Sequence, residues 1–483
     1  MTKKKRKFML SAFSIIFILI IALAILSHVL PDAKFVGDVI VDGSGTVGAT
    51  ISDVLLSPIL GFSDAVDVCV FVLILGGFLA IVTKTGALET GIKVLVKKLK
   101  GNELVLIPIL MLIFSIGGTT YGMLEETVGF YVLLAATMVA AGMDTLVGSA
   151  IVLLGAGSGV LGSTVNPFAV GAAVSSLPEG VTANQGLLIF TGLLLWITTL
   201  VISIIFVMNY AKKVQEDKGS TFLSLQEQKA MEKKFAAEIE GSKDKTKDVK
   251  LTGKQKVTLI LLGLTFIVMI IGFIPWGDFN VTIFDKFTGW LTGTPLGGWY
   301  FAEASVWFFV MAIVIGIINR MKEKEIVDTF IDGANDMISV VLIIAVARGA
   351  SVLMSVTYLD NYIIYNAANW LSNLPELAFV PLNYLLHVVL SILVPSSSGL
   401  AVLSTPIMGG LASTLGYGVE TTIMTFVSAN GLVNLITPTC GAIMGGLALA
   451  KVEYTTWFKW AFKIIVCIAI ANILILELIT LVF

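Results

Sequence analysis

The segment 114–127, FSIGGTTYGMLEET, interrupts a long apolar stretch with glycines, hydroxyls and two carboxylates. The flanking apolar runs, 104–113 and 128–141, are each too short to cross a bilayer, because a spanning helix needs about 20 apolar residues. Two short runs around a break predict a re-entrant hairpin, with the two glycines and two threonines in its turn. Non-helical backbone is tolerated at this depth only where it is buried in protein or lines a wet cavity. The break is therefore a candidate binding site.

The same pattern returns in the second half of the chain. The segment 392–408, ILVPSSSGLAVLSTPIM, places a proline, three serines and a glycine between two short apolar runs. Each predicted hairpin (103–141 and 377–413) precedes a span (145–177 and 419–447) that is broken in its second half, at GSTVNP and at NLITPT. Recurrence in the same order predicts an internal repeat with a substrate site at the breaks. For any single break, ordinary packing of small residues between helices is the alternative.

The composition identifies an integral membrane protein, with 57% hydrophobic and 13% charged residues. A formal net charge of −2 gives no reason to expect a nucleic-acid partner. Cys69, Cys440 and Cys467 lie far apart, and His28 and His387 are isolated from one another. We therefore expect no metal, no other cofactor and no enzymatic activity.

Charge distribution predicts the orientation in the cytoplasmic membrane. A basic cluster at residues 3–7 precedes an apolar run at 8–30 that has no cleavage site, so this run is a first spanning helix with its N-terminus inside. Lysine-rich loops then fall on one side when spans are counted along the chain. The charged segment 211–256 is expected to be a cytoplasmic connector, 31–63 an outer loop, and the C-terminus lies outside.

This count divides the chain into two halves of opposite orientation, 1–210 and 302–483, with a linking span at 257–273. Each half has two spans, an amphipathic segment, a hairpin, a broken span and a last span, which in the first half is 186–210. The expected fold is an all-α polytopic membrane protein, an inverted-repeat transporter with two opposed re-entrant hairpins and two broken helices. The chain has no GxxxxGK[ST] loop, which argues against an ATP-driven pump.

Four motifs resemble the YfcC-type family: GGTTYGMLEET, GSTVNPFAVGAAVSSLP, VPSSSGLAVLSTPIMGGLA and NGLVNLITPTCGAIMGGLALAKVEYTTWFKW. The resemblance covers nearly the whole chain. It implies a basic amino acid antiporter related to the arginine–ornithine exchangers and to the anaerobic four-carbon dicarboxylate carriers. It also implies the fold of the ion transporter superfamily, in which a transport domain moves against a scaffold and homodimers are common.

The candidate substrate-binding groups lie at the four breaks. Hairpin tips and the ends of broken helices suit a carboxylate, since free backbone N–H groups and hydroxyls donate hydrogen bonds to it. Each side chain could instead cap a helix or bond between helices. The candidates without charge are Thr119, Thr120, Ser163, Thr164, Asn166, Ser396, Ser397, Ser398, Asn434, Thr437 and Thr439.

Glu125 and Glu126 are the candidate anions for a substrate cation, because a carboxylate in an apolar segment is costly unless it is paired or functional. Adjacent helical positions point about 100° apart, so we expect one of them to face the substrate. The other is expected to pair with Arg348, the one arginine of the apolar run 338–356, although Arg348 could instead bind a substrate carboxylate. Secondary candidates are Asp332 and Asp336.

Charges near the predicted membrane borders have a simpler interpretation. Asp64, Asp67 and Lys84 are expected to extend toward the interface with water rather than to serve a site.

Three functions remain open from the sequence. The first is exchange of basic amino acids, and the second is transport of four-carbon dicarboxylates, with hydroxyls, helix N-termini and Arg348 as ligands. The third, a non-transporting membrane scaffold or sensor, is disfavoured by the repeated breaks. A dianion beside a desolvated glutamate would meet repulsion of several kcal/mol, so the basic amino acid is the expected substrate.

Overall fold

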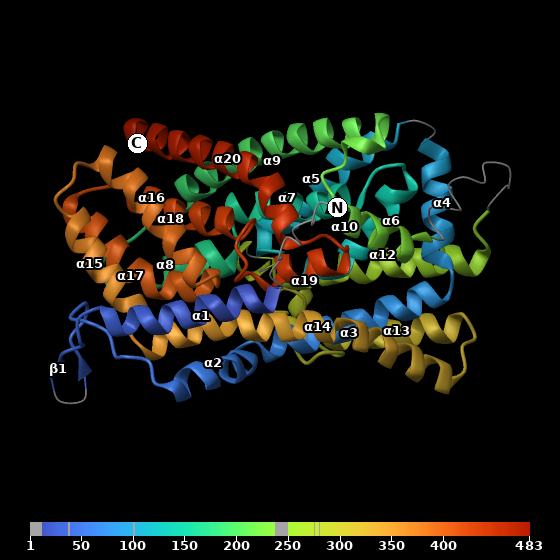
Figure 1. The fold of residues 1–483 in the computed structure, drawn as a ribbon, viewed down its shortest axis with the longest axis horizontal. Coiled ribbons are helices and arrows are strands. Elements are labelled where there is room, and N and C mark those ends of the chain that lie inside the picture. Colours follow the sequence, from blue (N-terminus) through green and yellow to red (C-terminus); the bar gives the residue numbers. More distant parts are fainter. Residues whose placement is uncertain (1–11, 37–38, 100–101, 237–249, 275, 280) are drawn as a thin grey trace, which may run out of the picture.

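The computed structural model is built from helices, and most of the long ones run along its longest axis (Figure 1). It describes residues 12–483 except 37–38, 100–101, 237–249, 275 and 280. The basic cluster at residues 3–7 and part of the predicted connector therefore lie outside the described residues. Within this part of the chain, nine helices are long and apolar enough to cross a membrane. The chain is thus an all-α polytopic membrane protein, as predicted.

The first half of the chain contains nine α-helices in the described ranges. Their bounds are α1 (Ala12–Val29), α2 (Ile51–Asp64), α3 (Val66–Lys84), α4 (Ala87–Leu99), α5 (Leu106–Tyr121), α6 (Phe130–Ala140), α7 (Thr145–Leu161), α8 (Ala172–Ser175) and α9 (Gln185–Glu216). Short helical turns precede α5, α6 and α8, at η1 (Glu103–Val105), η2 (Glu125–Gly129) and the π-turn η3 (Pro167–Gly171). A small antiparallel ribbon, β1 (Phe35–Val36) and β2 (Val39–Ile40), follows α1.

The rest of the described chain, from the connector onward, is also helical. Its helices are α10 (Leu225–Lys234), α12 (Gly253–Phe273), α13 (Phe301–Ile318), α14 (Glu323–Val356), α15 (Leu359–Leu371), α16 (Glu376–Leu393), α17 (Ser397–Leu415), α18 (Val419–Val433), α19 (Gly441–Leu449) and α20 (Tyr454–Val482). Short 3-10 turns are η4 (Lys218–Ser220), η5 (Trp276–Phe279) and η6 (Phe284–Lys286). In Figure 1, α15 and the C-terminus lie at one end of the long axis and α4 lies at the other.

Helix α2 corrects the prediction that residues 31–63 form a loop. Thr50 and Asp53 form a capping box that starts this helix, so an aspartate that we assigned to an acidic loop has a structural role. The helix packs against α14, where a Cβ on Gly61 would lie 2.4 Å from the backbone nitrogen of Gly349. The close approach of the two backbones explains why a proline-containing segment is held in a helix here.

The turn of the first hairpin also differs from the prediction. Gly117, Gly118 and the two threonines that follow lie inside α5, and the chain leaves the helix at Gly122, whose φ is +83°. The earlier glycines serve packing instead, because a Cβ on Gly118 would lie 2.1 Å from the carbonyl oxygen of Ala156 in α7. The second hairpin turns between α16 and α17, where it was predicted.

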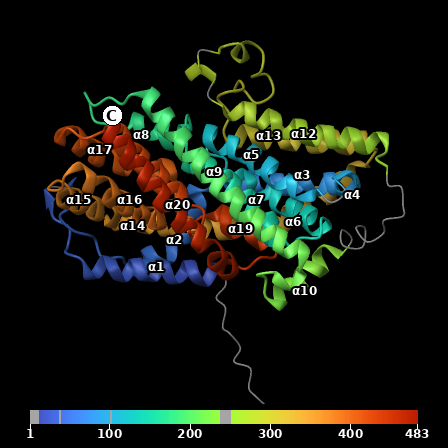
Figure 2. The ribbon, with the colours of Figure 1, turned by 90° about the horizontal axis from the view of Figure 1, so that it is seen from above.

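Both broken helices are interrupted at the predicted places. Helix α7 ends at Leu161 and α18 ends at Val433, each just before the predicted break. The last helices of the two halves, α9 and α20, lie side by side (Figures 1 and 2). Helix α9 is longer than the predicted span 186–210, because it runs into the connector to Glu216. The division into inverted repeats and the re-entry of the hairpins stay predictions.

Two buried carboxylates, Asp144 and Glu227, join the connector to α7 and to the start of α20. Asp144, the N-cap of α7, accepts hydrogen bonds of 2.6 Å from the hydroxyls of both Tyr210 and Thr221. Glu227 of α10 accepts from the backbone nitrogen of Glu453 at 2.8 Å and from Thr456 Oγ1 at 3.0 Å, at the start of α20. The described part of the connector is thus packed against the helices rather than separate from them.

Candidate functional site

The tips of both hairpins and both helix breaks meet at one cavity of about 130 Å³. The first hairpin contributes Gly122, Leu124, Glu125 and Glu126, and the first broken helix contributes Asn166 and Phe168. From the second half come Pro395, Ser396, Ser397, Ser398, Asn434, Thr439, Cys440 and Gly441, while α14 contributes Arg348 and the start of α13 contributes Tyr300 and Phe301. Segments far apart in sequence therefore form a single polar site.

On the first-half side, Asn166 joins the helix break to the hairpin tip. Its Nδ2 donates to Ser163 Oγ at 3.0 Å, and its Oδ1 accepts from the backbone nitrogen of Phe168 at 2.9 Å. A Cβ on Gly122 would lie 2.8 Å from the Asn166 side chain, and its positive φ already favours glycine. The backbone turn and the asparagine therefore constrain each other.

On the second-half side, the side chains of Asn430 and Asn434 hold the hairpin tip through hydrogen bonds. Asn434 Nδ2 donates to the carbonyl oxygen of Pro395 at 3.2 Å and to Asn430 Oδ1 at 3.1 Å. The same Asn430 oxygen accepts from Ser397 Oγ at 2.7 Å, and Asn430 Nδ2 donates to Ser391 Oγ at 3.2 Å. The buried Oδ1 of Asn434 has no partner in the described structure, which leaves an acceptor at the edge of the cavity.

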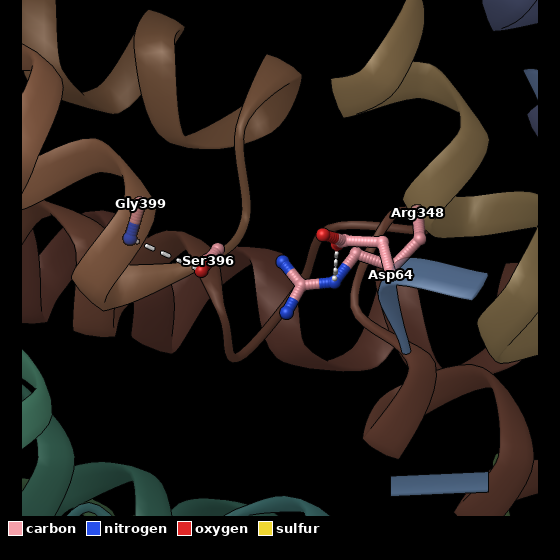
Figure 3. Close-up of polar contacts among 4 residues, drawn as sticks. All are labelled: Asp64, Arg348, Ser396 and Gly399. Carbon is pink, nitrogen blue, oxygen red and sulfur yellow. Dashed lines mark hydrogen bonds and ion pairs between the residues drawn. The ribbon is translucent and has the colours of Figure 1, made fainter. Parts of the chain in front are cut away.

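The tip of the second hairpin is also the start of a helix. Ser396 is the N-cap of α17 and accepts from the backbone nitrogen of Gly399 at 3.2 Å (Figure 3). Ser397 and Ser398 form the first turn of this helix, whose N-terminal N–H groups and dipole favour an anion. Gly441, the first residue of α19, lines the same cavity. The second half thus supplies groups suited to a carboxylate.

The carboxylates of Glu125 and Glu126 both line the cavity, although we expected only one of them to face it. They begin the 3-10 turn η2 at the hairpin tip rather than continuing an α-helix. Glu126 is 3% exposed and accepts from the backbone nitrogen of Leu124 at 3.0 Å. The first half therefore supplies the negative charge of the site.

Arg348 lines the cavity but has a different partner from the one we predicted. Its Nε lies 3.1 Å from Oδ2 of Asp64, at the end of α2 (Figure 3). The ion pair of Arg348 is therefore formed with Asp64 and not with a glutamate, and Asp64, which we expected only to extend toward water, contacts a residue of the cavity. The cause is α2 itself, which places Asp64 beside α14.

The remaining predicted residues lie behind the cavity or away from it. Thr119 Oγ1 donates to the carbonyl oxygen of Gly162 at 2.8 Å, and Thr120 bonds back to its own helix. Five predicted residues near the breaks do not line the cavity: Thr119, Thr120, Ser163, Thr164 and Thr437. Asp332 and Asp336 of α14 do not line it either. Within the described residues, no group of three or more His, Cys, Asp or Glu side chains could hold a metal ion.

Sequence reasoning missed three residues of this region. Asn430 supports both Ser397 and Asn434, and its position one helical turn before Asn434 was the available signal. Tyr300 packs edge-on against Phe168 with ring centroids 5.0 Å apart, and no local pattern in the sequence marked it. Asp64 had no signal in its own segment, because its partner lies in α14.

Similarity to known proteins extends over most of the chain. An uncharacterized protein of Haemophilus influenzae is 29% identical over 427 residues, covering 88% of this chain and 78% of that protein. The Escherichia coli protein YfcC, whose name provisionally assigns it basic amino acid antiport, is 28% identical over 409 residues, covering 82% of this chain and 74% of that protein.

Among solved structures, the Alcanivorax borkumensis YdaH transporter has a TM-score of 0.46 at 13% identity, covering 97% of this chain and 98% of that chain. Neisseria gonorrhoeae MtrF, from a class of antimetabolite efflux pumps, has a TM-score of 0.44 at 17% identity, covering 99% of this chain and 96% of that chain. The family model described as DcuC, C4-dicarboxylate anaerobic carrier, matches residues 9–481. The chain is therefore a membrane transporter that belongs to the DcuC family.

Proposed function

We propose that this transporter is an antiporter that exchanges basic amino acids of the arginine and ornithine type across the cytoplasmic membrane by alternating access. The observation that carries the proposal is the pair of carboxylates, Glu125 and Glu126, in the cavity where the two hairpins meet. A carboxylate held at this depth is costly unless a cation or a hydrogen-bond donor accompanies it.

The cavity has the two poles that a zwitterion with a cationic side chain needs. One wall carries the glutamates of the first hairpin, which suit an ammonium or a guanidinium. The opposite half supplies Ser397, Ser398 and the N-termini of α17 and α19, which suit an α-carboxylate. A basic amino acid would satisfy both poles at once.

Transport of a four-carbon dicarboxylate is the second candidate, and Arg348 in the cavity wall is the observation that favours it. The family description points the same way. Arg348 already faces an anion in Asp64, however, so the cavity holds two carboxylates against one compensated cation. Two like charges at 4 Å repel by about 4 kcal/mol at an effective dielectric constant of 20, which opposes a dianion beside either glutamate.

Counterflow in liposomes distinguishes the two candidates. Purified full-length protein is reconstituted with internal ornithine, and uptake of labelled arginine, lysine, succinate and fumarate is measured from outside. We expect internal ornithine to accelerate arginine uptake and to leave succinate uptake at the level of protein-free liposomes. Exchange of succinate for fumarate without exchange of any basic amino acid would show that the substrate assignment is wrong.

The orientation belongs to the same proposal. With the N-terminus inside and the C-terminus outside, the first hairpin opens from the cytoplasm and the second from the exterior. The two poles of the cavity would then be reached from opposite sides, as alternating access requires. We also propose a homodimer as the working assembly, which mass measurement of the detergent-solubilised protein tests.

A further inference from the structure

A second cavity of about 780 Å³ adjoins the proposed substrate site. It lies between the C-terminal half of α14, the start of α15 and the first turns of α17. Arg348, Ser396 and Ser398 line both cavities, so the two adjoin at these residues. The end of the molecule that carries α15 is the end we expect to face outward (Figure 1).

The ion pair of Arg348 with Asp64 stands where the two cavities meet. The pair uses Nε of Arg348, and Figure 3 shows the two terminal nitrogens of the guanidinium directed away from Asp64, toward the loop of Ser396. The Arg348 side chain is 28% exposed and that of Asp64 is 54% exposed. A pair held through one N–H and half open to solvent is weaker than a bidentate buried pair, so a competing cation can replace it.

Asp64 has Arg348 as its ion-pair partner in the described structure. It is the last residue of α2 and stands two residues before α3 begins at Val66, so the negative pole of one helix and the positive pole of the next both lie near its carboxylate. The ion pair with Arg348 is therefore the charged contact that holds this side chain. A second cation in the cavity would serve the same purpose.

The second cavity has apolar and polar walls, and its polar part holds a second carboxylate besides Asp64. Asp360 accepts from Ser355 Oγ at 3.0 Å, and both residues line the cavity. The hydroxyl of Ser351 is buried in the wall without a partner in the described structure. The cavity therefore offers a substrate cation one further carboxylate and one free hydroxyl.

We propose that the second cavity is an entry subsite for the cationic side chain of a basic amino acid. In this subsite Asp64 exchanges Arg348 for the substrate guanidinium or ammonium, and the released Arg348 receives the substrate carboxylate. The subsite rests on the proposed function, since it assumes a basic amino acid as substrate. It adds Asp64 as a residue that selects for the cation before the substrate reaches Glu125 and Glu126.

The test compares arginine with citrulline, which has nearly the same shape but a neutral side chain. In proteoliposomes made with Asp64→Asn, we expect the KM for arginine to rise about tenfold or more, with kcat changed less than twofold, because a charge-assisted contact is lost. The preference for arginine over citrulline as a competitor should fall by the same factor. Asp64→Glu, which keeps the charge, should stay within about threefold of wild type.

Asp67→Asn is the matched control, since it removes an equal charge from the next helix and lines neither cavity. Its KM should match that of wild type. If Asp64→Asn is not monodisperse after purification, the double variant Asp64→Asn with Arg348→Gln removes both charges of the pair and should show the same loss of preference for arginine. An unchanged KM and an unchanged preference in whichever of these variants folds would overturn the subsite.

The two proposals fail in different ways. If the wild-type protein exchanges arginine and Asp64→Asn has the same affinity for arginine as wild type, the entry subsite is wrong and the proposed function stands. If the wild-type protein exchanges no basic amino acid, the proposed function is wrong and the subsite is wrong with it.

Discussion

The two hairpin tips occupy corresponding places in the two halves, yet they present opposite chemistry to the cavity. The first turns at Gly122 and brings two carboxylates, Glu125 and Glu126, on a 3-10 turn. The second turns at Pro395 and brings hydroxyls at the N-terminus of α17. Similar backbone architecture therefore carries an acidic wall in one half and a donor-rich wall in the other.

This difference shows what a repeated fold leaves free to vary. The breaks in the helices need only small residues, proline and nearby partners for the backbone. The side chains at the turn are unconstrained by that requirement, so each half can carry its own polarity. Under the proposed function, a site built from one acidic and one donor-rich tip would bind a substrate that has both charges.

The strongest test of the comparison removes the charge of the first tip. Glu125→Gln and Glu126→Gln should each lower kcat/KM for arginine by about 30- to 4,000-fold, since truncating one partner of a desolvated charge pair costs roughly 2–5 kcal/mol. Counterflow in liposomes measures the effect. Glu179→Gln, on an exposed loop, is the control and should match wild type. If both variants at the tip exchange arginine normally, the acidic wall has no role in binding.

The next test concerns how the first tip is held. Gly118→Ala should destabilise the protein by about 1–3 kcal/mol, near the upper end, because the new Cβ would meet backbone in α7 rather than a flexible side chain. Thermal unfolding in detergent measures the loss. Gly263→Ala in α12, where a Cβ meets nothing within 4 Å, should be neutral or slightly stabilising. Equal melting temperatures for the two variants would contradict the packing role of Gly118.

The uncharged polar residues that line the cavity should respond more mildly and without loss of folding. Ser397→Ala and Asn166→Ala should each weaken arginine binding about five- to 150-fold, since a lost hydrogen bond in a dry site costs about 1–3 kcal/mol. Ser413→Ala, exposed near the far end of α17, is the control. Binding by scintillation proximity would measure the change. Affinities equal to wild type in both variants would place the site away from the tips.

The opposed orientation of the tips is tested without changing transport. In a background where Cys467 is replaced by serine, a cysteine at Ser220 should be protected from an impermeant thiol reagent in sealed cells. A cysteine at Asp285 should be labelled from outside, and both sites are exposed on the protein surface. Labelling of the Ser220 site from outside would reverse the predicted topology.

The sequence alone was enough to place the breaks, because their causes are local. Proline removes a backbone donor and the residues beside it cannot continue the helix, so Pro167, Pro395 and Pro438 mark three interruptions without knowledge of the fold. Apolar length likewise determined that the protein spans a membrane. The order of the predicted spans and breaks followed from these two signals, whereas helix α2 did not.

Tertiary structure decided which polar groups meet. Helix α2 was hidden in a segment that we assigned to a loop, and without it the partner of Arg348 could not be identified. Whether a glycine makes a turn, as Gly122 does, or a helix contact, as Gly118 does, depends on which backbone lies opposite. Sequence periodicity describes one helix at a time. Packing alone determines the register between helices, and that register forms the cavity, its acidic and donor-rich walls and the Asp64–Arg348 pair.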